Sequence, residues 1–230
     1  VTVVCSEKGW LRALRGHVEE GHDVRYKDGD KGRFWLHAQS TDKLVLFATN
    51  GRFYTLSCDK LPGGRGNGEP VRLLLDLAND QEIISMMVHD PERKLLVASS
   101  DGRGFVVEEK ATVAQTRGGR QVLNVSGDVE AAVCAPVQGD HLAVVGDNHK
   151  LLLFPLTELP EMNRGRGVVL QRYRDGGLAD AKTMTLTDGL TWRQAGGRTR
   201  TETDLEMWLG KRSQAGRLAP KGFPKNHKFG

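Results

Sequence analysis

The sequence is short of cysteine and of long hydrophobic runs. Its three cysteines, Cys5, Cys58 and Cys134, lie far apart and form no CxxC motif. Their odd number and wide spacing favour reduced, buried or half-buried thiols in a cytosolic protein over a disulfide framework. No apolar run approaches the roughly 18 residues that span a membrane, and no signal peptide is recognisable. We therefore expect neither a membrane anchor nor a secreted scaffold.

Catalytic and nucleotide-binding signatures are also missing. The stretch from Gly64 to Gly68 does not fit GxGxxG, lacks a GK[ST] ending and does not lead into a helical pattern. No GxSxG motif or catalytic Cys–His arrangement is evident. Asp188 and Glu202 are candidates for paired carboxylates, but nothing in the sequence sets their separation. The sequence therefore predicts no catalytic residue and no cofactor in this chain.

One pair of histidines has acidic neighbours. His17 and His22 lie five residues apart, near Glu19, Glu20 and Asp23. A metal site needs convergent ligands and a well-placed third ligand, which this local spacing does not supply. We expect solvated loop residues here, and no metal site.

Glycine, in contrast, is abundant. The chain has 28 glycines in 230 residues, well above the usual ~7%. Surplus glycine without low complexity indicates many tight turns and therefore many short strands. A chain of this length is compatible with a single all-β domain. Because it begins with Val1 rather than methionine, we expect a piece cut from a longer protein.

Positive charge is concentrated near the end of the chain. The net charge is +4, but residues 191–230 carry nine Lys or Arg and three acids, which makes this segment +6 and the first 190 residues −2. A basic end on a nearly neutral body indicates an anionic partner, although a solvated tail is the simpler alternative.

A hairpin pattern recurs along the chain. Each copy has an apolar run, a turn containing Gly or Asn, and a second alternating run, which is typical of a β-hairpin with positive φ in its turn. Three clear copies and two weaker ones at the ends span residues 2–14, 43–56, 94–107, 141–154 and 191–202. The turn positions Gly9, Gly51, Gly102, Asn148 and Gly197 are separated by 42, 51, 46 and 49 residues.

A basic segment that contains glycine follows each of four hairpins. These segments are PGGRGNGEP (62–70), QTRGGRQ (115–121), MNRGRGVV (162–169) and QAGRLAPKG (214–222). Their arginines Arg65, Arg117, Arg166 and Arg217 fall 52, 49 and 51 residues apart. Two markers that recur in phase indicate five units of roughly 46 residues.

A period near 45 residues with about four strands per unit is typical of a β-propeller. We predict an all-β, five-bladed, propeller-like ring that forms one domain, with repeats over residues 1–42, 43–92, 93–139, 140–182 and 183–230. Alternation predicts a core that contains Leu44, Leu46, Leu95, Val97, Leu142, Val144, Leu151 and Leu153. Residues 204–212 alone have helical character, so we expect at most one short helix there. The WD and kelch signatures are absent.

Arginines beside glycines suit the binding of a polyanion. Glycine lets another chain approach the backbone closely, and the guanidinium fork matches phosphate oxygens. One such segment per unit would line one rim of the ring and hold duplex DNA through phosphate contacts. The candidate DNA-binding residues are Arg65, Arg117, Arg120, Arg164, Arg166, Arg198, Arg200, Lys211, Arg212, Arg217 and Lys221. The alternative is that the glycines only shape the crossover between blades and that the arginines are solvated.

The repeats and the segment around Gly118 resemble the C-terminal β-pinwheel domain of bacterial type II DNA topoisomerase A subunits, found in DNA gyrase and topoisomerase IV. The hallmark of gyrase is a Q-R-R-G-G-K-G box in the first blade. Residues 115–121 match it at the Gln, the second Arg and both Gly, with Arg120 for Lys, whereas Thr116 and Gln121 depart. Because the first unit has no box, the resemblance favours the topoisomerase IV branch.

The resemblance implies a non-catalytic module that binds and bends double-stranded DNA and helps select crossings for decatenation and relaxation. It also implies as partners the N-terminal region of the same A subunit, which holds the catalytic tyrosine, and the B subunit, which binds ATP. We accordingly assign no catalytic role to Tyr26, Tyr54 or Tyr173. The implied location is the bacterial cytoplasm, in association with the nucleoid.

Three other hypotheses remain at this point. A gyrase-type domain would wrap DNA with strong positive writhe. A propeller that scaffolds protein partners would not bind duplex DNA at all. An enzyme with its site in a central channel would need titratable side chains that converge at one end of the ring.

Overall fold

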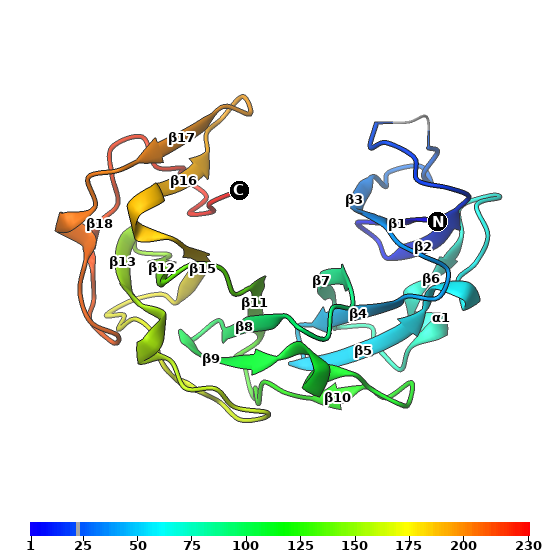
Figure 1. The fold of residues 1–230 in the computed structure, drawn as a ribbon, viewed down its shortest axis with the longest axis horizontal. Helices are drawn as coiled ribbons and strands as arrows, with labels where there is room; N and C mark the ends of the chain where they lie inside the picture. The colour runs from blue at the N-terminus through cyan, green and yellow to red at the C-terminus, as the bar shows by residue number, and fades with distance from the viewer. Residues whose placement is uncertain (22–23) are drawn as a thin grey trace. The chain divides into compact units, whose positions relative to one another are not determined.

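The computed structural model describes residues 1–21 and 24–230, so His22 and Asp23 of the histidine cluster lie outside the described residues (Figure 1). The chain forms two compact units. The first contains Val1–Pro91 and Thr112–Gln121, and the second contains Glu92–Ala111 and Val122–Gly230. Nearly all the regular structure is β-strand, which confirms the expected all-β class.

The first unit holds two four-stranded antiparallel sheets. In the first sheet the order is β3 (Gly32–His37), β1 (Thr2–Ser6), β2 (Trp10–Leu14) and β6 (Glu69–Pro70). In the second sheet the order is β10 (Arg120–Gln121), β5 (Arg52–Ser57), β4 (Lys43–Ala48) and β7 (Ile83–Val88). The hairpins β1–β2 and β4–β5 occupy the two central positions of their sheets.

The second unit holds three sheets. The third sheet has the order β11 (Ala131–Pro136), β8 (Lys94–Ser99), β9 (Arg103–Glu108) and β14 (Val168–Val169). The fourth has the order β15 (Leu178–Met184), β12 (His141–Gly146), β13 (Lys150–Pro155) and β18 (Arg217–Leu218). The fifth, within the described residues, is the two-stranded hairpin of β16 (Leu190–Arg193) and β17 (Thr199–Glu202). Five sheets built around five hairpins confirm the predicted number of blades.

The short edge strands exchange between repeats. The strands β6, β10 and β14 end the basic glycine segments 62–70, 115–121 and 162–169, and β18 lies within the segment 214–222. Each pairs with the second strand of a hairpin from the preceding repeat, so we call these four basic segments the exchange segments. In the second sheet, for example, Arg120 and Gln121 pair with Phe53 and Arg52. Each four-stranded sheet therefore contains strands from two of the predicted sequence repeats. The repeat boundaries themselves remain a prediction from the sequence.

The hairpin turns use positive φ angles as expected, with one shift of position. Gly51 has φ 77° and Gly102 has φ 84°. In the fourth hairpin the left-handed residue is His149, with φ 64°, rather than Asn148. The Asn148 side chain instead accepts a hydrogen bond at 3.0 Å from the backbone N–H of Lys150, as asparagine commonly does in a turn.

The central strands are buried on both faces. All eight predicted core residues are fully buried, and so are the intervening Val45 and Phe47. In β12, Leu142 belongs to a cluster with Leu96 of β8, whereas the adjacent Ala143 belongs to a cluster with Trp192 of β16. Because successive side chains of a strand point to opposite faces, each hairpin contributes to two cores. This explains why these strands read as continuous apolar runs.

The sequence predicted at most one short helix over residues 204–212. That stretch forms only the 3-10 turn η5 (Glu206–Trp208), and Leu209 then bridges in parallel fashion to Leu153. A single turn of α-helix, α1 (Val71–Leu74), instead follows β6. The remaining 3-10 turns are η1 (Cys58–Lys60), η2 (Glu109–Thr112), η3 (Leu156–Glu158) and η4 (Leu186–Asp188).

Candidate nucleic-acid interface

Each basic segment enters its edge strand through a glycine that no other residue replaces easily. These glycines are Gly68, Gly119, Gly167 and Gly216, with φ values of 81°, 73°, 77° and 80°. A Cβ atom on any of them would collide with a backbone carbonyl of the strand it joins. On Gly119 the Cβ would lie 2.6 Å from the carbonyl oxygen of Phe53. The second glycine of the RGGR motif is therefore required by strand exchange, whatever the segment binds.

Arginines on the hairpins hold the basic segments in place. The guanidinium of Arg52 donates to the carbonyl oxygens of Gly118 at 3.1 Å and Gly119 at 3.5 Å. Arg103, at the same place in the next hairpin, donates to the carbonyl of Gly167 at 3.4 Å. Arg12 of β2 donates in the same way to the carbonyl of Gly66. Sequence reasoning missed these residues, although Arg52 and Arg103 each directly follow a turn glycine.

Ten of the eleven candidate DNA-binding side chains are exposed, and Arg212 is half-buried. The first unit contains three of them, Arg65, Arg117 and Arg120. The second unit contains the other eight, Arg164, Arg166, Arg198, Arg200, Lys211, Arg212, Arg217 and Lys221. Their arrangement along one rim, which would require the positions of both units, remains a prediction.

The arginines differ in where they stand within their segments. Counted from the glycine that opens the edge strand, Arg65 lies three positions before it, Arg117 two and Arg166 one, whereas Arg217 directly follows its glycine. The segments are equivalent in the fold, but the guanidinium groups leave the backbone at different points. The nearly regular spacing of these arginines in the sequence therefore does not make them equivalent in structure.

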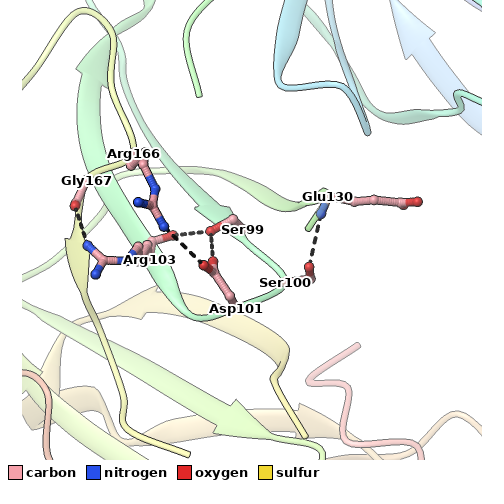
Figure 2. A network of polar contacts seen from close by, with 7 residues as sticks. All are labelled: Ser99, Ser100, Asp101, Arg103, Glu130, Arg166 and Gly167. Carbon is pink, nitrogen blue, oxygen red and sulfur yellow. Dashed lines mark hydrogen bonds and ion pairs between the residues drawn. The ribbon is translucent and has the colours of Figure 1, made fainter. Parts of the chain in front are cut away.

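Three candidate arginines are paired with carboxylates, and one of these pairs, Arg200 Nη2 with Glu202 Oε2 at 3.6 Å, lies within the strand β17. Arg117 Nε lies 3.5 Å from Asp76 Oδ1, and Arg166 Nη2 lies 4.0 Å from Asp101 Oδ2. Figure 2 shows the pair in which Arg166 points toward Asp101 in the turn between β8 and β9. The side chains of Arg117 and Arg166 remain more than half exposed, so they can still reach an external ligand.

Three candidates make further contacts, which anchor the chain. Arg212, which lies two residues before the last basic segment, donates to the carbonyl oxygen of Val169 in β14 at 2.8 Å. Arg164 Nε donates to the side chain of Asn124 at 3.3 Å. Arg200 lies over the ring of the buried Trp192 and donates to the carbonyl of Lys221 at 3.1 Å. For Arg212 this contact gives a structural role that the sequence did not indicate.

The remaining candidates carry no ion pair within the part of the chain that the structure describes. They are Arg65, Arg120, Arg198, Lys211, Arg217 and Lys221. Cationic groups without an internal ion pair can bind external phosphate without first breaking one. This set is therefore the one most open to a polyanion.

The glycines of residues 64–68 and the histidine His17, to which the sequence gave no ligand-binding role, have structural roles. Gly64 and Gly68 belong to the first exchange segment, and His17 stacks on His37 with ring centroids 4.7 Å apart. Within residues 1–21 and 24–230, no three His, Cys, Asp or Glu side chains gather closely enough to hold a metal ion. Burial raises the pKa of the Cys5 thiol to about 12, which makes it a poor nucleophile.

Residues 42–90, 93–133 and 140–178, more than half of the chain, match the family described as DNA gyrase C-terminal domain, beta-propeller. The chain is 46% identical to the A subunit of DNA topoisomerase 4 from Caulobacter vibrioides, over 100% of this chain and 30% of that protein. It is 42% identical to the A subunit of DNA topoisomerase 4 from Rickettsia bellii, over 100% of this chain and 31% of that protein. The chain thus spans about a third of the length of these curated relatives.

The fold matches a solved domain over nearly its full length. The structure of the E. coli ParC C-terminal domain superposes with a TM-score of 0.84 and 26% sequence identity, over 97% of this chain and 95% of that one. This agrees with the β-pinwheel that the sequence resemblance implied. Within the described residues, no helix is both long and apolar enough to span a membrane.

Proposed function

Because the chain belongs to the DNA gyrase C-terminal beta-propeller family, we propose that it is a non-catalytic module that binds and bends double-stranded DNA. The observation that carries this proposal is the set of exposed cationic side chains on and around the exchange segments. Strand exchange orders the backbone of each segment, while side chains such as Arg65, Arg120 and Arg217 extend into solvent. An ordered backbone with exposed cations suits a surface that meets phosphate groups.

Binding of this kind is dominated by phosphate contacts. Guanidinium and ammonium groups release counterions from the duplex, so affinity falls steeply with salt and depends little on base sequence. The edge strands β6, β10, β14 and β18 are each only two residues long, which is too short for a ribbon that reads a groove. We therefore infer largely sequence-independent recognition.

Within the family, the proposed setting is the A subunit of a topoisomerase IV. The relatives named above are subunits of that enzyme, and the degenerate glycine box in the third sequence repeat supports the same branch. In this setting the module would act in the bacterial cytoplasm, at the nucleoid, and help select crossings for decatenation and relaxation. The catalytic steps would be carried out by the N-terminal region of that same polypeptide and by the ATP-binding B subunit.

The test is a fluorescence-anisotropy titration of the chain with linear duplexes of unrelated sequence, first at low salt and then at rising salt. The variant R65A/R120A removes two cations that have no ion pair among the described residues. It should weaken binding to all duplexes alike and reduce the slope of log K against log salt by up to about two.

Substitution of Lys60, an exposed cation outside the candidate set, by Ala is the matched control and should change binding less. Absence of duplex binding by the parent at low salt would overturn the proposal. A topology assay on bound circular DNA separates the two branches of the family, because strong positive writhe would indicate gyrase-type wrapping.

A further inference from the structure

Asp76 meets Arg117 across two segments of the first unit. Asp76 follows α1, and its backbone N–H donates to the carbonyl oxygen of Arg117 at 3.0 Å. Its carboxylate then lies 3.5 Å from Arg117 Nε, while Nη2 of the same guanidinium donates to the carbonyl of Leu73 at 2.8 Å. The backbone bond fixes the register of the two segments, so the carboxylate and the guanidinium are held close together.

Asp101 meets Arg166 in the second unit, from a different part of the fold. Asp101 lies in the β8–β9 turn and accepts a hydrogen bond from the Ser99 hydroxyl, which orients its carboxylate. Arg166 Nη2 lies 4.0 Å from it, and Arg103 holds the adjacent Gly167 by its carbonyl (Figure 2). Two unrelated loops therefore each place an aspartate beside an arginine of an exchange segment.

A carboxylate and a phosphate compete for the same guanidinium group. Both are oxyanions that accept hydrogen bonds from the guanidinium fork, so an arginine engaged with one has fewer donors for the other. Arg65, Arg120 and Arg217 have no such competitor among the described residues. The candidate arginines therefore fall into a paired class and an unpaired class.

We propose that Asp76 and Asp101 set the DNA affinity of this domain, by holding Arg117 and Arg166 in ion pairs that a duplex phosphate must displace. The inference rests on the proposed DNA binding and names two residues that tune it. Each pair keeps its arginine in place but reduces the net charge that the segment presents to DNA. The domain therefore binds DNA with lower affinity than the number of its arginines suggests, and this affinity falls less steeply as the salt concentration rises.

The substitutions Asp76→Asn and Asp101→Asn remove one negative charge each and nearly preserve the side-chain volume. Because exposed ion pairs contribute little, each variant should bind duplex DNA about twofold to fivefold more tightly than the parent. The slope of log K against log salt should become steeper, since a released guanidinium neutralises phosphate more fully.

A double-mutant cycle separates pairing from simple net charge. Asp101→Asn should raise affinity in the parent, but it should have little effect in the Arg166→Ala background, where there is no guanidinium to release. The same cycle applies to Asp76 and Arg117. Asp188→Asn, which adds the same charge at an exposed residue of η4 without an ion pair in the described structure, is the control and should have a smaller effect.

Three results would overturn the inference. Equal affinity of Asp76→Asn, Asp101→Asn and the parent would show that the pairs do not restrain binding. An equal effect of Asp101→Asn with and without Arg166 would show a general charge effect. If the parent binds no duplex at low salt, both the proposed function and this inference are wrong. If the parent binds duplex but the aspartate and arginine substitutions show no coupling, only this inference is wrong.

Discussion

Gly119 packs against the carbonyl oxygen of Phe53 so closely that the strand pairing leaves no room for a side chain. Gly119 has φ 73°, and the next two residues pair with β5 as the edge strand β10. Its neighbour Gly118 meets only Thr116 Oγ1, 3.8 Å from a Cβ. The two glycines of RGGR are therefore not equivalent, because only the second is required by the geometry of strand exchange.

The difference between the two glycines gives a first prediction. Gly119→Ala should lower the free energy of unfolding by roughly 1–3 kcal/mol, because the left-handed backbone and the collision both oppose a Cβ. Gly118→Ala is the matched control and should change it by less than about 0.5 kcal/mol. Urea unfolding followed by circular dichroism measures both. Equal stability of the two variants would contradict the strand-exchange argument.

A second prediction concerns the arginines that hold the segments. Arg52→Ala should destabilise the domain by roughly 1–2 kcal/mol, because the carbonyls of Gly118 and Gly119 lose a charged donor. Arg65→Ala removes an exposed arginine that makes no ion pair in the described structure. The free energy of unfolding of this variant should remain within about 0.5 kcal/mol of that of the parent. Thermal unfolding of the two variants should rank them in this order, and the reverse order would refute the anchoring role of Arg52.

The two-sided core gives a third prediction. Leu142 and Leu153 are both fully buried but belong to different clusters of the second unit. Leu142→Ala and Leu153→Ala should each cost about 2–5 kcal/mol. Leu218→Ala, at a side chain that is 65% exposed, should cost far less. If one of the two buried substitutions proved as mild as Leu218→Ala in denaturant unfolding, that face of the sheet would not be a packed core.

A fourth prediction follows from the pKa of Cys5. Burial raises this pKa from 9.0 to about 12 in the folded chain. Between these values the unfolded chain loses the thiol proton while the folded chain keeps it, so stability falls as pH rises above 9.0. The difference in unfolding free energy between the parent and Cys5→Ala should change by about 1.4 kcal/mol from pH 8 to pH 10.

The measurement for Cys5 is urea unfolding of both proteins across that pH range. Tyrosine and lysine titration affects the two proteins equally and cancels in the difference. A difference that stays constant with pH would show that the folded thiol ionises as readily as the unfolded one.

The sequence alone determined the local elements of this protein. Asn50-Gly51 and Asp101-Gly102 predicted hairpins because glycine adopts the positive φ of a tight turn without steric cost. The apolar runs beside these turns predicted strands, and their residues proved to be buried. Over residues 204–212 the sequence predicted at most one short helix, and the structure has only the 3-10 turn η5 there, after which Leu209 is extended and bridges to Leu153.

Only the tertiary structure decided what the basic segments join and which arginines are paired. The pairing of Gln121 with Arg52, and of Asp101 with Arg166, joins residues from different repeats. Local patterns encode backbone dihedral preferences and periodicity, whereas such partners depend on how distant segments pack and on which carbonyls and carboxylates that packing brings within reach. The sequence of the RGGR motif therefore showed that glycine and positive charge occur together. Only the fold showed that Gly119 is required for strand exchange and that Arg117 forms an ion pair with Asp76.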